Sequence, residues 1–366
     1  MAQDLQHAIE SGALSFGNRL RPLRELAAHY GVSLIRTQRV MVELERRGLV
    51  QRRHGAGVFV TYHRPEITAT EAAVVMMVQH RDPLFDRFAG RLSDGLTTMG
   101  LQPIRAASLA KSEGALGAWL ETWRHRPPRA VVVQQSRAGL HDAVERACGG
   151  RSLLAEVFRV PYPATRFHRL NPDYADACRS AVAYSLARGH RRIGLVTPAR
   201  RIDPQTGHCR SKRASGHTYL IREMGRALCE AGVRRHGLAV HYMLRADALE
   251  QKVPSIDQNS ALHPANMTRL QRWLQRPDRP TAVFGDDHRI AGVIRAATQL
   301  GLRIGEDLDV LGQGNTDWSQ ALNFPSIDLQ PELVADEMLD LIRRNEEVGS
   351  LRSRHDVAVP VRLVER

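Results

Sequence analysis

The chain has 366 residues and a formal net charge of +13, and almost all of its basic residues are arginines. This length predicts roughly two domains of about 150 residues, each large enough for its own core. No apolar stretch approaches the ~18 residues of a membrane helix, and the first residues lack the basic-then-apolar layout of a secretory signal. These features argue against a membrane or secreted protein and favour a cytoplasmic one.

Cysteine usage predicts free, buried thiols. The cysteines are Cys148, Cys178, Cys209 and Cys229, and none of them forms a CxxC pair of the kind used in zinc sites and redox motifs. His208, Cys209 and His217 could together suggest metal ligands, but this group lacks a second cysteine nearby. We therefore expect neither a metal site nor a cofactor.

Positive charge is concentrated near the amino terminus. Residues 1–65 contain ten arginines and five acidic residues, a net charge of +5, whereas the remaining 301 residues carry +8. A segment that must neutralise phosphates is expected to have such a charge density. The amino-terminal segment is thus the candidate nucleic-acid-binding part of the chain.

Two short helices are predicted within this segment. Residues 23–30 place apolar side chains at the i, i+3, i+4, i+7 spacing of a half-buried helix, which ends at Gly31. Ser33 can cap a second helix, in which residues 37–44 repeat the same spacing before Gly48 ends it. The two buried faces predict a helix-turn-helix.

The second helix carries a candidate base-reading face. The side chains opposite its apolar stripe or beside its first turn are Ile35, Arg36, Gln38, Arg39, Val42 and Arg46. Arginine can form two hydrogen bonds with guanine, glutamine can do so with adenine, and an aliphatic side chain can contact the methyl group of thymine. The alternative is a solvated surface helix that binds nothing.

A hairpin predicted directly after this helix favours the DNA-binding interpretation. The strand-like runs 49–53 and 58–60 flank a turn whose glycines permit positive φ, and the tip carries Arg52, Arg53 and His54. A wing of this kind donates hydrogen bonds to phosphates or enters a minor groove. Residues 1–61 are therefore predicted to form a winged helix-turn-helix domain.

This segment resembles the GntR family of bacterial transcription regulators. The residues that match the family pattern are Arg24, Glu25, Leu26, Ala27, Gly31, Val32, Ser33, Gly48, Leu49, Val50, Gly55, Gly57, Phe59 and Val60. The resemblance implies DNA contacts from Arg24, from the first turn of the recognition helix after Ser33, and from the wing tip at His54 and Gly55. Leu34 and Arg36-Thr37 depart from the usual residues, so the family pattern does not define the operator sequence.

An α/β domain is predicted over residues 73–366, after a polar linker at 62–72. Residues 74–78 form a short apolar run typical of a buried parallel strand. Helical segments end at Gly100, Gly189, Gly232 and Gly301, and a strand-like run follows each of them. Further strands are predicted at 129–134, 157–160, 281–285 and 357–363. This alternation, at nearly 300 residues, predicts two lobes built on doubly wound parallel sheets, with a ligand cleft at the carboxyl ends of the strands.

Three segments of this domain resemble the LacI-type, periplasmic-binding-protein-like effector domain. They are ARGHRRIGLV at 187–196, the block at 281–316 that contains GDDHRIAGVIRAATQLGLRIGEDLDVLG, and DPLF at 82–85, which ends at Phe85. The resemblance implies a ligand that donates hydroxyl hydrogen bonds to Asp287 and is held by Arg213. An ordinary ion-pair role for these two residues is the alternative.

At two places the sequence differs from the pattern of sugar-binding relatives, and this changes the ligand that we expect. Arg159 lies near a position where sugar-binding relatives can carry an acid, and Gln313-Gly314-Asn315 replaces the usual aromatic-Asp-Asp. A sugar acid would suit an arginine-lined cleft because the guanidinium group pairs well with a carboxylate. We therefore expect a sugar or a sugar acid as the effector, with Arg159 and Asn315 near it.

Together these features predict a dimeric, sequence-specific repressor whose affinity for a double-stranded DNA operator is controlled by a small polar ligand. The alternatives are a ligand-independent regulator whose second domain serves only dimerisation, and a cytoplasmic sugar-binding protein. An enzyme that uses pyridoxal phosphate would need a Schiff-base lysine. Lys111, Lys212 and Lys252 lie in no aminotransferase context, so we do not expect an enzyme.

Overall fold

The computed structural model of the chain divides into two compact units, Met1–Ala69 and Thr70–Arg366. The boundary falls within the predicted linker. The residues that the structure describes are 1–10, 14, 17–46, 49–53, 57–61, 72–77, 83–106, 113–134, 140–148, 150–158, 166–198, 216–233, 238–243, 264–348 and 353–366. Apart from Ala72, the linker lies outside this set.

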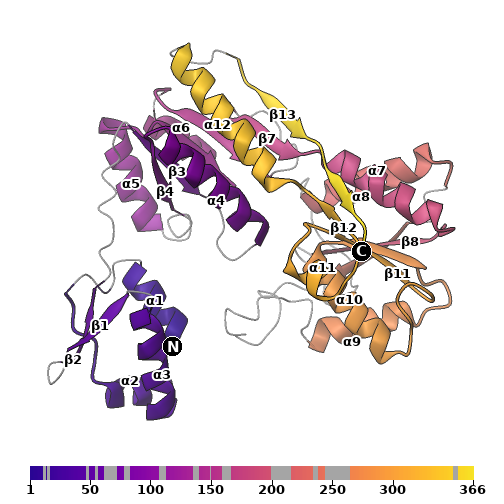
Figure 1. Cartoon of the computed structure of the whole chain (residues 1–366), viewed down its shortest axis with the longest axis horizontal. Coiled ribbons are helices and arrows are strands. Elements are labelled where there is room, and N and C mark those ends of the chain that lie inside the picture. Colours follow the sequence, from indigo (N-terminus) through magenta and orange to yellow (C-terminus); the bar gives the residue numbers. More distant parts are fainter. Residues whose placement is uncertain are drawn as a thin grey trace. The chain divides into compact units, whose positions relative to one another are not determined.

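The first unit contains the predicted helix-turn-helix and wing (Figure 1). Its helices are α1 (Ala2–Glu10), α2 (Leu23–Tyr30) and α3 (Leu34–Arg46), and its strands are β1 (Val50–Arg53) and β2 (Gly57–Val60). The two strands form an antiparallel hairpin in which Val50 is opposite Val60. The sequence analysis did not predict α1, although Leu5 and Ile9 lie one helical turn apart and are buried in the core of this unit.

The second unit has two lobes, and the first is built on a parallel sheet. In the described residues its strands are β3 (Ala73–Met77), β4 (Gln102–Arg105), β5 (Ala130–Val133), β6 (Leu153–Val157), β7 (His168–Pro172) and β13 (Asp356–Val359). Their order is β13-β7-β6-β5-β3-β4, and each described pair is parallel. Every residue of β3, β5 and β6 is buried, so this part of the sheet is covered on both faces.

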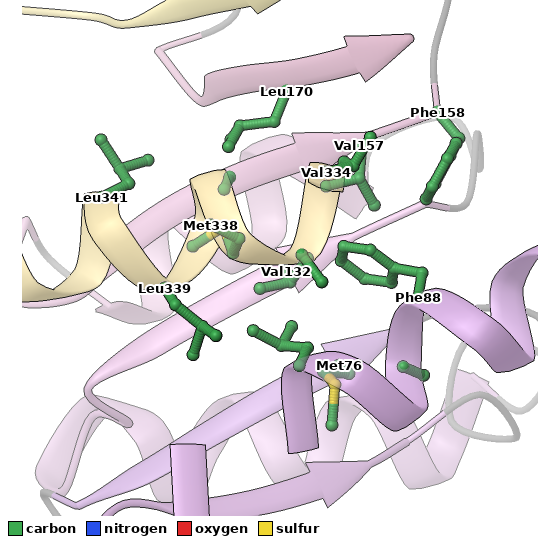
Figure 2. Packing of buried hydrophobic residues seen from close by; sticks show 14 of the residues in the cluster. Met76, Phe88, Val132, Val157, Phe158, Leu170, Val334, Met338, Leu339 and Leu341 are labelled. Atoms are coloured by element: carbon green, nitrogen blue, oxygen red, sulfur yellow. The ribbon is translucent and has the colours of Figure 1, made fainter. Parts of the chain in front are cut away.

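Helices α4 (Pro83–Thr98) and α12 (Pro331–Glu347) lie side by side on one face of this sheet (Figure 1). Figure 2 shows Phe88 of α4 and Met338 and Leu339 of α12 packed over Met76 and Val132 of the sheet. The lobe also contains α5 (Glu113–His125) and α6 (Leu140–Cys148). Although α12 follows most of the second lobe in sequence, its apolar face belongs to the core of the first lobe.

The second lobe is also built on a mostly parallel sheet, but its edge strand Arg362–Val364 runs antiparallel to the neighbouring strand Ser326–Asp328. Its described strands are β8 (Ile193–Pro198), β9 (Leu238–Met243), β10 (Ala282–Gly285), β11 (Asp309–Gln313), β12 (Ser326–Asp328) and β14 (Arg362–Val364), in the order β14-β12-β11-β10-β8-β9. Helices α7 (Tyr174–Ala187) and α8 (Gly216–Glu230) share one hydrophobic cluster with the sheet, and α9 (Pro264–Leu274) and α10 (Asp287–Gln299) share another. A short helix, α11 (Asp317–Ala321), follows β11. The predicted two-lobed, doubly wound α/β fold is confirmed.

The described chain passes between the lobes at Asp173, at Leu329-Gln330 and at Pro360-Val361. These crossings are bonded to each other. The backbone N–H of Asp173 donates to the Val359 carbonyl at 2.7 Å, and the Gln330 side-chain amide donates to the Pro360 carbonyl at 2.7 Å. Crossings of this kind between two lobes are the usual position of a hinge.

Four details of the predicted strands were wrong or missing. The strand predicted at 157–160 is β6, which ends at Val157, and the strand predicted at 357–363 is divided by Pro360 into β13 and β14. Proline lacks the N–H that a continuous ladder requires. Strands β7 and β12 were not predicted, because HRLNP and SID contain too few apolar residues to show a strand pattern.

A tight contact between α4 and α12 leads to a test of the fold. A Cβ atom placed on Gly95 would overlap the side chain of Leu339, which is buried. Gly95→Ala is therefore expected to lower the free energy of unfolding by about 1–3 kcal/mol, because the two helices must move apart. Gly117→Ala is the control, since no atom lies within 4 Å of a Cβ at that helical site. It is expected to raise stability by about 0.5–1 kcal/mol in urea denaturation; equal effects of the two substitutions would contradict the prediction.

Candidate functional site

The recognition helix α3 is anchored by one face and exposes the other. Thr37, Met41 and Leu44 are buried, and the predicted base-reading face points into solvent. The described exposed residues of that face are Ile35, Arg36, Gln38, Arg39 and Val42, and Ile35 is 66% exposed. Large aliphatic side chains at that exposure contribute little to the core of this unit. These side chains are therefore free to contact another molecule.

The turn before α3 is closed by local hydrogen bonds. Gly31 adopts a left-handed conformation with φ of 61°, which ends α2, and the N–H of Val32 donates to the Ala27 carbonyl at 3.0 Å. The Ser33 hydroxyl then accepts from the N–H of Arg36 at 3.3 Å, as a helix cap does. The sequence pattern predicted this cap, and it sets the angle at which the first turn of α3 is presented.

The arginines of this surface are available for binding. Arg24 on α2 and Arg36 and Arg39 on α3 are exposed, and none of the three pairs with an acidic side chain among the described residues. An unpaired arginine can contact a phosphate or a base edge without first losing a protein partner. Their DNA contacts remain predictions, which this placement favours.

The wing differs from the prediction at Arg52. Its backbone N–H and its Nε both donate to the carboxylate of Glu45 on α3, at 2.8 and 2.7 Å. The first of these hydrogen bonds makes the largest contribution to lowering the pKa of Glu45, followed by the second. Arg52 thus fastens the wing to the recognition helix and is less free to bind DNA than its sequence position suggests. The side chain of Arg53, and His54 and Gly55, lie outside the described residues.

Arg19 joins the wing, which the sequence analysis did not anticipate. Residues 17–20 lie beside β2: the N–H of Leu20 donates to the Val58 carbonyl at 2.8 Å, and the N–H of Val60 donates to the Asn18 carbonyl at 2.9 Å. The guanidinium group of Arg19 covers Gly57, where a Cβ would lie 2.8 Å from its Nε. This pairing joins segments about forty residues apart, so no local periodicity could have indicated it.

In the second lobe, Asp287 occupies the first turn of α10 and is 1% exposed. One carboxylate oxygen accepts from the N–H and the hydroxyl of Thr316, at 2.6 and 2.8 Å. The other accepts from the Ser326 hydroxyl at 2.7 Å. Gly312 lies so close to the carboxylate that a Cβ there would overlap it. Asp287 therefore holds the segment after β11 against β12, and its contact with a ligand stays a prediction.

The other predicted effector residues have different surroundings. Phe85 is 8% exposed and meets Phe158 edge to face at 5.3 Å within the core of the first lobe. The Asn315 side-chain amide donates to Asp328 at 3.1 Å, and its carbonyl oxygen accepts from Arg366. The structure thus places Phe85 and Asn315 in packing and polar contacts of the protein itself. Arg213 and Arg159 lie outside the described residues, as do His208 and Cys209.

A second polar group at the start of α10 was not predicted. Burial lowers the pKa of His288 to about 4, so its imidazole is neutral at pH 7 and can both donate and accept a hydrogen bond. The adjacent Arg289 forms an ion pair with Asp286. The carboxyl ends of parallel strands are the usual ligand positions of this architecture, and α10 begins at such an end. His288 therefore lies at the expected edge of the second sheet.

Other kinds of site receive no support from the described part of the chain. No group of three or more histidine, cysteine, aspartate or glutamate residues is placed there to hold a metal ion. Among the helices described, none combines the length and apolar character needed to cross a membrane. Cys148 and Cys178 are free and buried, as predicted, whereas Cys229 is free but exposed near the end of α8, so its predicted burial was wrong. Cys209 is not among the described residues.

Comparison with known families agrees with this architecture. The pattern of the family described as "Periplasmic binding protein-like domain" matches residues 182–366, just over half of the chain. The chain belongs to the periplasmic binding protein-like family. The pattern described as "Bacterial regulatory proteins, gntR family" matches residues 1–60. The two resemblances predicted from sequence are thus confirmed for the head and for the second lobe with the carboxyl-terminal segment.

Individual relatives are distant. The HTH-type transcriptional repressor PurR of Shigella sonnei is 26% identical over 201 residues, which cover 54% of this chain and 42% of PurR. The chain spans about half the length, or less, of the curated relatives it matches. Two solved structures show the same fold at 16% identity. The first is a LacI family regulator of Enterococcus faecium with bound ribose. Its TM-score is 0.60, and the match covers 80% of this chain and 97% of the regulator. The second is the complex of the regulator CelR with cellobiose. Its TM-score is 0.61, and the match covers 94% of this chain and 98% of CelR.

Proposed function

We propose that the protein is a sequence-specific DNA-binding repressor whose affinity for its operator is controlled by a small polar ligand, a sugar or a sugar acid. The observation that carries the DNA-binding part is the exposed face of α3, with Arg36, Gln38 and Arg39 presented by a helix whose opposite face is buried. Winged heads of this kind usually act in pairs on two half-sites, so the proposed active form is a homodimer. Its place of action is the cytoplasm, where the operator is accessible.

Similar proteins support the ligand-controlled part of this proposal. PurR carries the name of a transcriptional repressor, and the two solved structures hold ribose and cellobiose. Two lobes joined at bonded crossings can adopt more than one relative orientation. A ligand that prefers one orientation shifts the population of the DNA-competent state, and DNA binding changes ligand affinity by the same factor.

Selection from a pool of randomised DNA duplexes tests DNA binding directly. We expect the dimer to enrich a motif with two-fold symmetry, because each head reads one half-site. Binding to that motif should weaken steeply as the salt concentration rises, because phosphate contacts release counterions. Failure to enrich any motif, in buffer where the protein is folded, would contradict the proposal.

A panel of sugars, sugar acids and polyols tests the ligand. A member that binds the folded state tightly should raise the melting temperature by mass action. The same compound should change the affinity for the selected DNA motif. A compound that stabilises the protein without any effect on DNA affinity would separate ligand binding from regulation.

A second function is favoured by the surroundings of Asp287. Its carboxylate is already engaged by Thr316 and Ser326, so a ligand would have to displace one of these groups or bind elsewhere. In a ligand-independent regulator, the second unit would provide only the dimer contact. No thermal shift with any member of the panel, together with an intact DNA motif, would support this second function.

Arg19 provides a test of the wing. Because Arg19 lies beside Gly57 of the wing, we expect it to contact a phosphate, so Arg19→Ala should make the slope of log affinity against log salt concentration less negative by about one. The backbone pairing of residues 17–20 with β2 does not depend on the side chain, so the wing should stay formed. Fluorescence anisotropy with a generic duplex measures this slope. Arg303→Ala, which removes an exposed arginine paired with Asp307 in the second unit, should leave the slope unchanged; an unchanged slope for Arg19→Ala would exclude a phosphate contact.

A further inference from the structure

Arg87, near the start of α4, contacts groups from both lobes of the second unit. Its Nε and Nη2 donate to the two carboxylate oxygens of Glu332 at 2.6 and 2.7 Å, which is the parallel two-bond geometry of a strong arginine–carboxylate pair. Its Nη1 donates to the Gly314 carbonyl at 3.4 Å, and Nη2 lies 3.5 Å from a carboxylate oxygen of Asp328. One guanidinium group thus meets three separate segments.

These partners belong to different lobes. Glu332 lies in the first turn of α12, which packs beside α4 in the core of the first lobe. Gly314 directly follows β11, and Asp328 ends β12, both in the sheet of the second lobe. The pair with Glu332 therefore fixes the guanidinium group within the first lobe, while its remaining N–H groups reach the second.

Asp328 is a rigid partner. It is 2% exposed, and it accepts hydrogen bonds from the N–H of Gln330 at 2.9 Å and from the Asn315 side chain at 3.1 Å. Arg362 also donates to it at 3.3 Å. Because Asn315 and Arg362 belong to the second lobe, these contacts keep Asp328 with that lobe, and a rotation of the lobes would change its distance from Arg87.

Arg87 stays charged throughout the physiological pH range. Burial lowers the pKa of its guanidinium group, but the hydrogen bonds that it donates to Glu332 and the charges of Asp328 and Glu332 together outweigh burial and raise it. The contact with the second lobe therefore does not depend on a change in the charge of Arg87. Movement of one lobe relative to the other would release it.

We propose that Arg87 is a latch between the lobes: its contacts with Gly314 and Asp328 stabilise the orientation of the lobes described here. These contacts break when the lobes rotate apart. Gly314 lies two residues before Thr316, whose N–H and hydroxyl are bound by Asp287. Arg87 and the predicted effector residue Asp287 therefore bind the same short segment, which contains Gly314 and Thr316. It requires no particular ligand and can be tested in the protein alone.

Arg91 offers a matched control on the same helix. It lies one turn beyond Arg87 and its Nε donates to Asp336 of α12 at 2.7 Å. Both members of this pair belong to the first lobe. Substitution of Arg91 therefore removes an α4–α12 ion pair of similar chemistry without any loss of contact with the second lobe.

Distances between spin labels on the two lobes test the latch. Suitable label sites are Ala118→Cys on α5 and Thr298→Cys on α10, both exposed, with Cys209 and Cys229 replaced by serine. Labelled protein is diluted into unlabelled protein so that only distances within one chain are measured. Electron paramagnetic resonance should then give one main distance population for the parent protein and for Arg91→Ala.

Arg87→Ala should add a second population at a changed distance, because the lobes are no longer held at Gly314 and Asp328. Arg87→Lys keeps the charge beside Glu332 but lacks the planar fork, so it should show the same second population with less disturbance of folding. Melting curves of each variant confirm that it is folded. Identical distance distributions for the parent, Arg87→Ala and Arg87→Lys would overturn the proposal, as would an equal change in Arg91→Ala.

Discussion

Ile35→Glu is expected to weaken binding of the selected DNA motif by at least about 2 kcal/mol, or roughly 30-fold. Ile35 is 66% exposed in the first turn of α3, where the proposed function places a base edge or a phosphate. A carboxylate there would lose the aliphatic contact and add repulsion from the phosphates. Because the side chain lies outside the core, the free energy of unfolding should change by less than about 0.5 kcal/mol.

Val348→Glu is the control for this substitution. Val348 is an aliphatic residue of similar exposure, 63%, in the second unit, so the same change in charge and hydropathy is made far from α3 in sequence. Gel-shift titrations of both variants against the selected motif separate a local effect from one of net charge. Equal DNA affinity of Ile35→Glu and the parent protein would show that the first turn of α3 does not face DNA.

Asp287→Ala should have the largest effect on stability. Its removal leaves the N–H and hydroxyl of the half-buried Thr316 and the hydroxyl of the buried Ser326 without their acceptor. We expect the free energy of unfolding to fall by about 3–5 kcal/mol, since hydrogen bonds to a charged group contribute about 1.5–3 kcal/mol each and are not fully additive. The midpoint of urea denaturation measures the loss.

Asp287→Asn separates the structural role from ligand binding. The amide keeps one acceptor oxygen for Thr316, and the Ser326 hydroxyl can rotate to accept from the NH2 group, so the loss should be only about 1–2 kcal/mol. If Asp287 also binds the effector, the folded Asn variant should lose the thermal shift that the ligand gives to the parent protein. Asp278→Ala removes an exposed aspartate and should leave the urea midpoint unchanged. A parent-like midpoint for Asp287→Ala would reject the structural role.

The amino-terminal head was predictable because its determinants are local. The apolar spacing of residues 23–30 and 37–44, the left-handed Gly31 and the cap at Ser33 each act within one or two helical turns. The role of Arg52 could not be predicted from the sequence in the same way. It occupies the position of a wing-tip arginine, but its partner Glu45 lies in the preceding helix, and only the folded hairpin brings the two together.

In the second unit, runs of apolar residues predicted some strands and missed others. The buried runs of β3, β5 and β10 read directly as parallel strands. Strand β7 does not, because its buried His168, Arg169 and Asn171 are polar. Arg169 is tolerated there because it pairs with Glu156 on β6, a partner that the strand sequence does not contain.

From the sequence alone follow most of the helix–strand alternation, the division into a basic head and an α/β body, and the families that each part resembles. These follow from spacing, caps and short motifs, which act over a few residues. Three features are visible only in the folded chain: Thr316 and Ser326 bind Asp287, α12 returns to the first lobe, and Arg87 contacts both lobes. Each of these features depends on contacts between segments far apart in the chain. Such contacts form, and stabilise the fold, only when the sheets and crossings are in place.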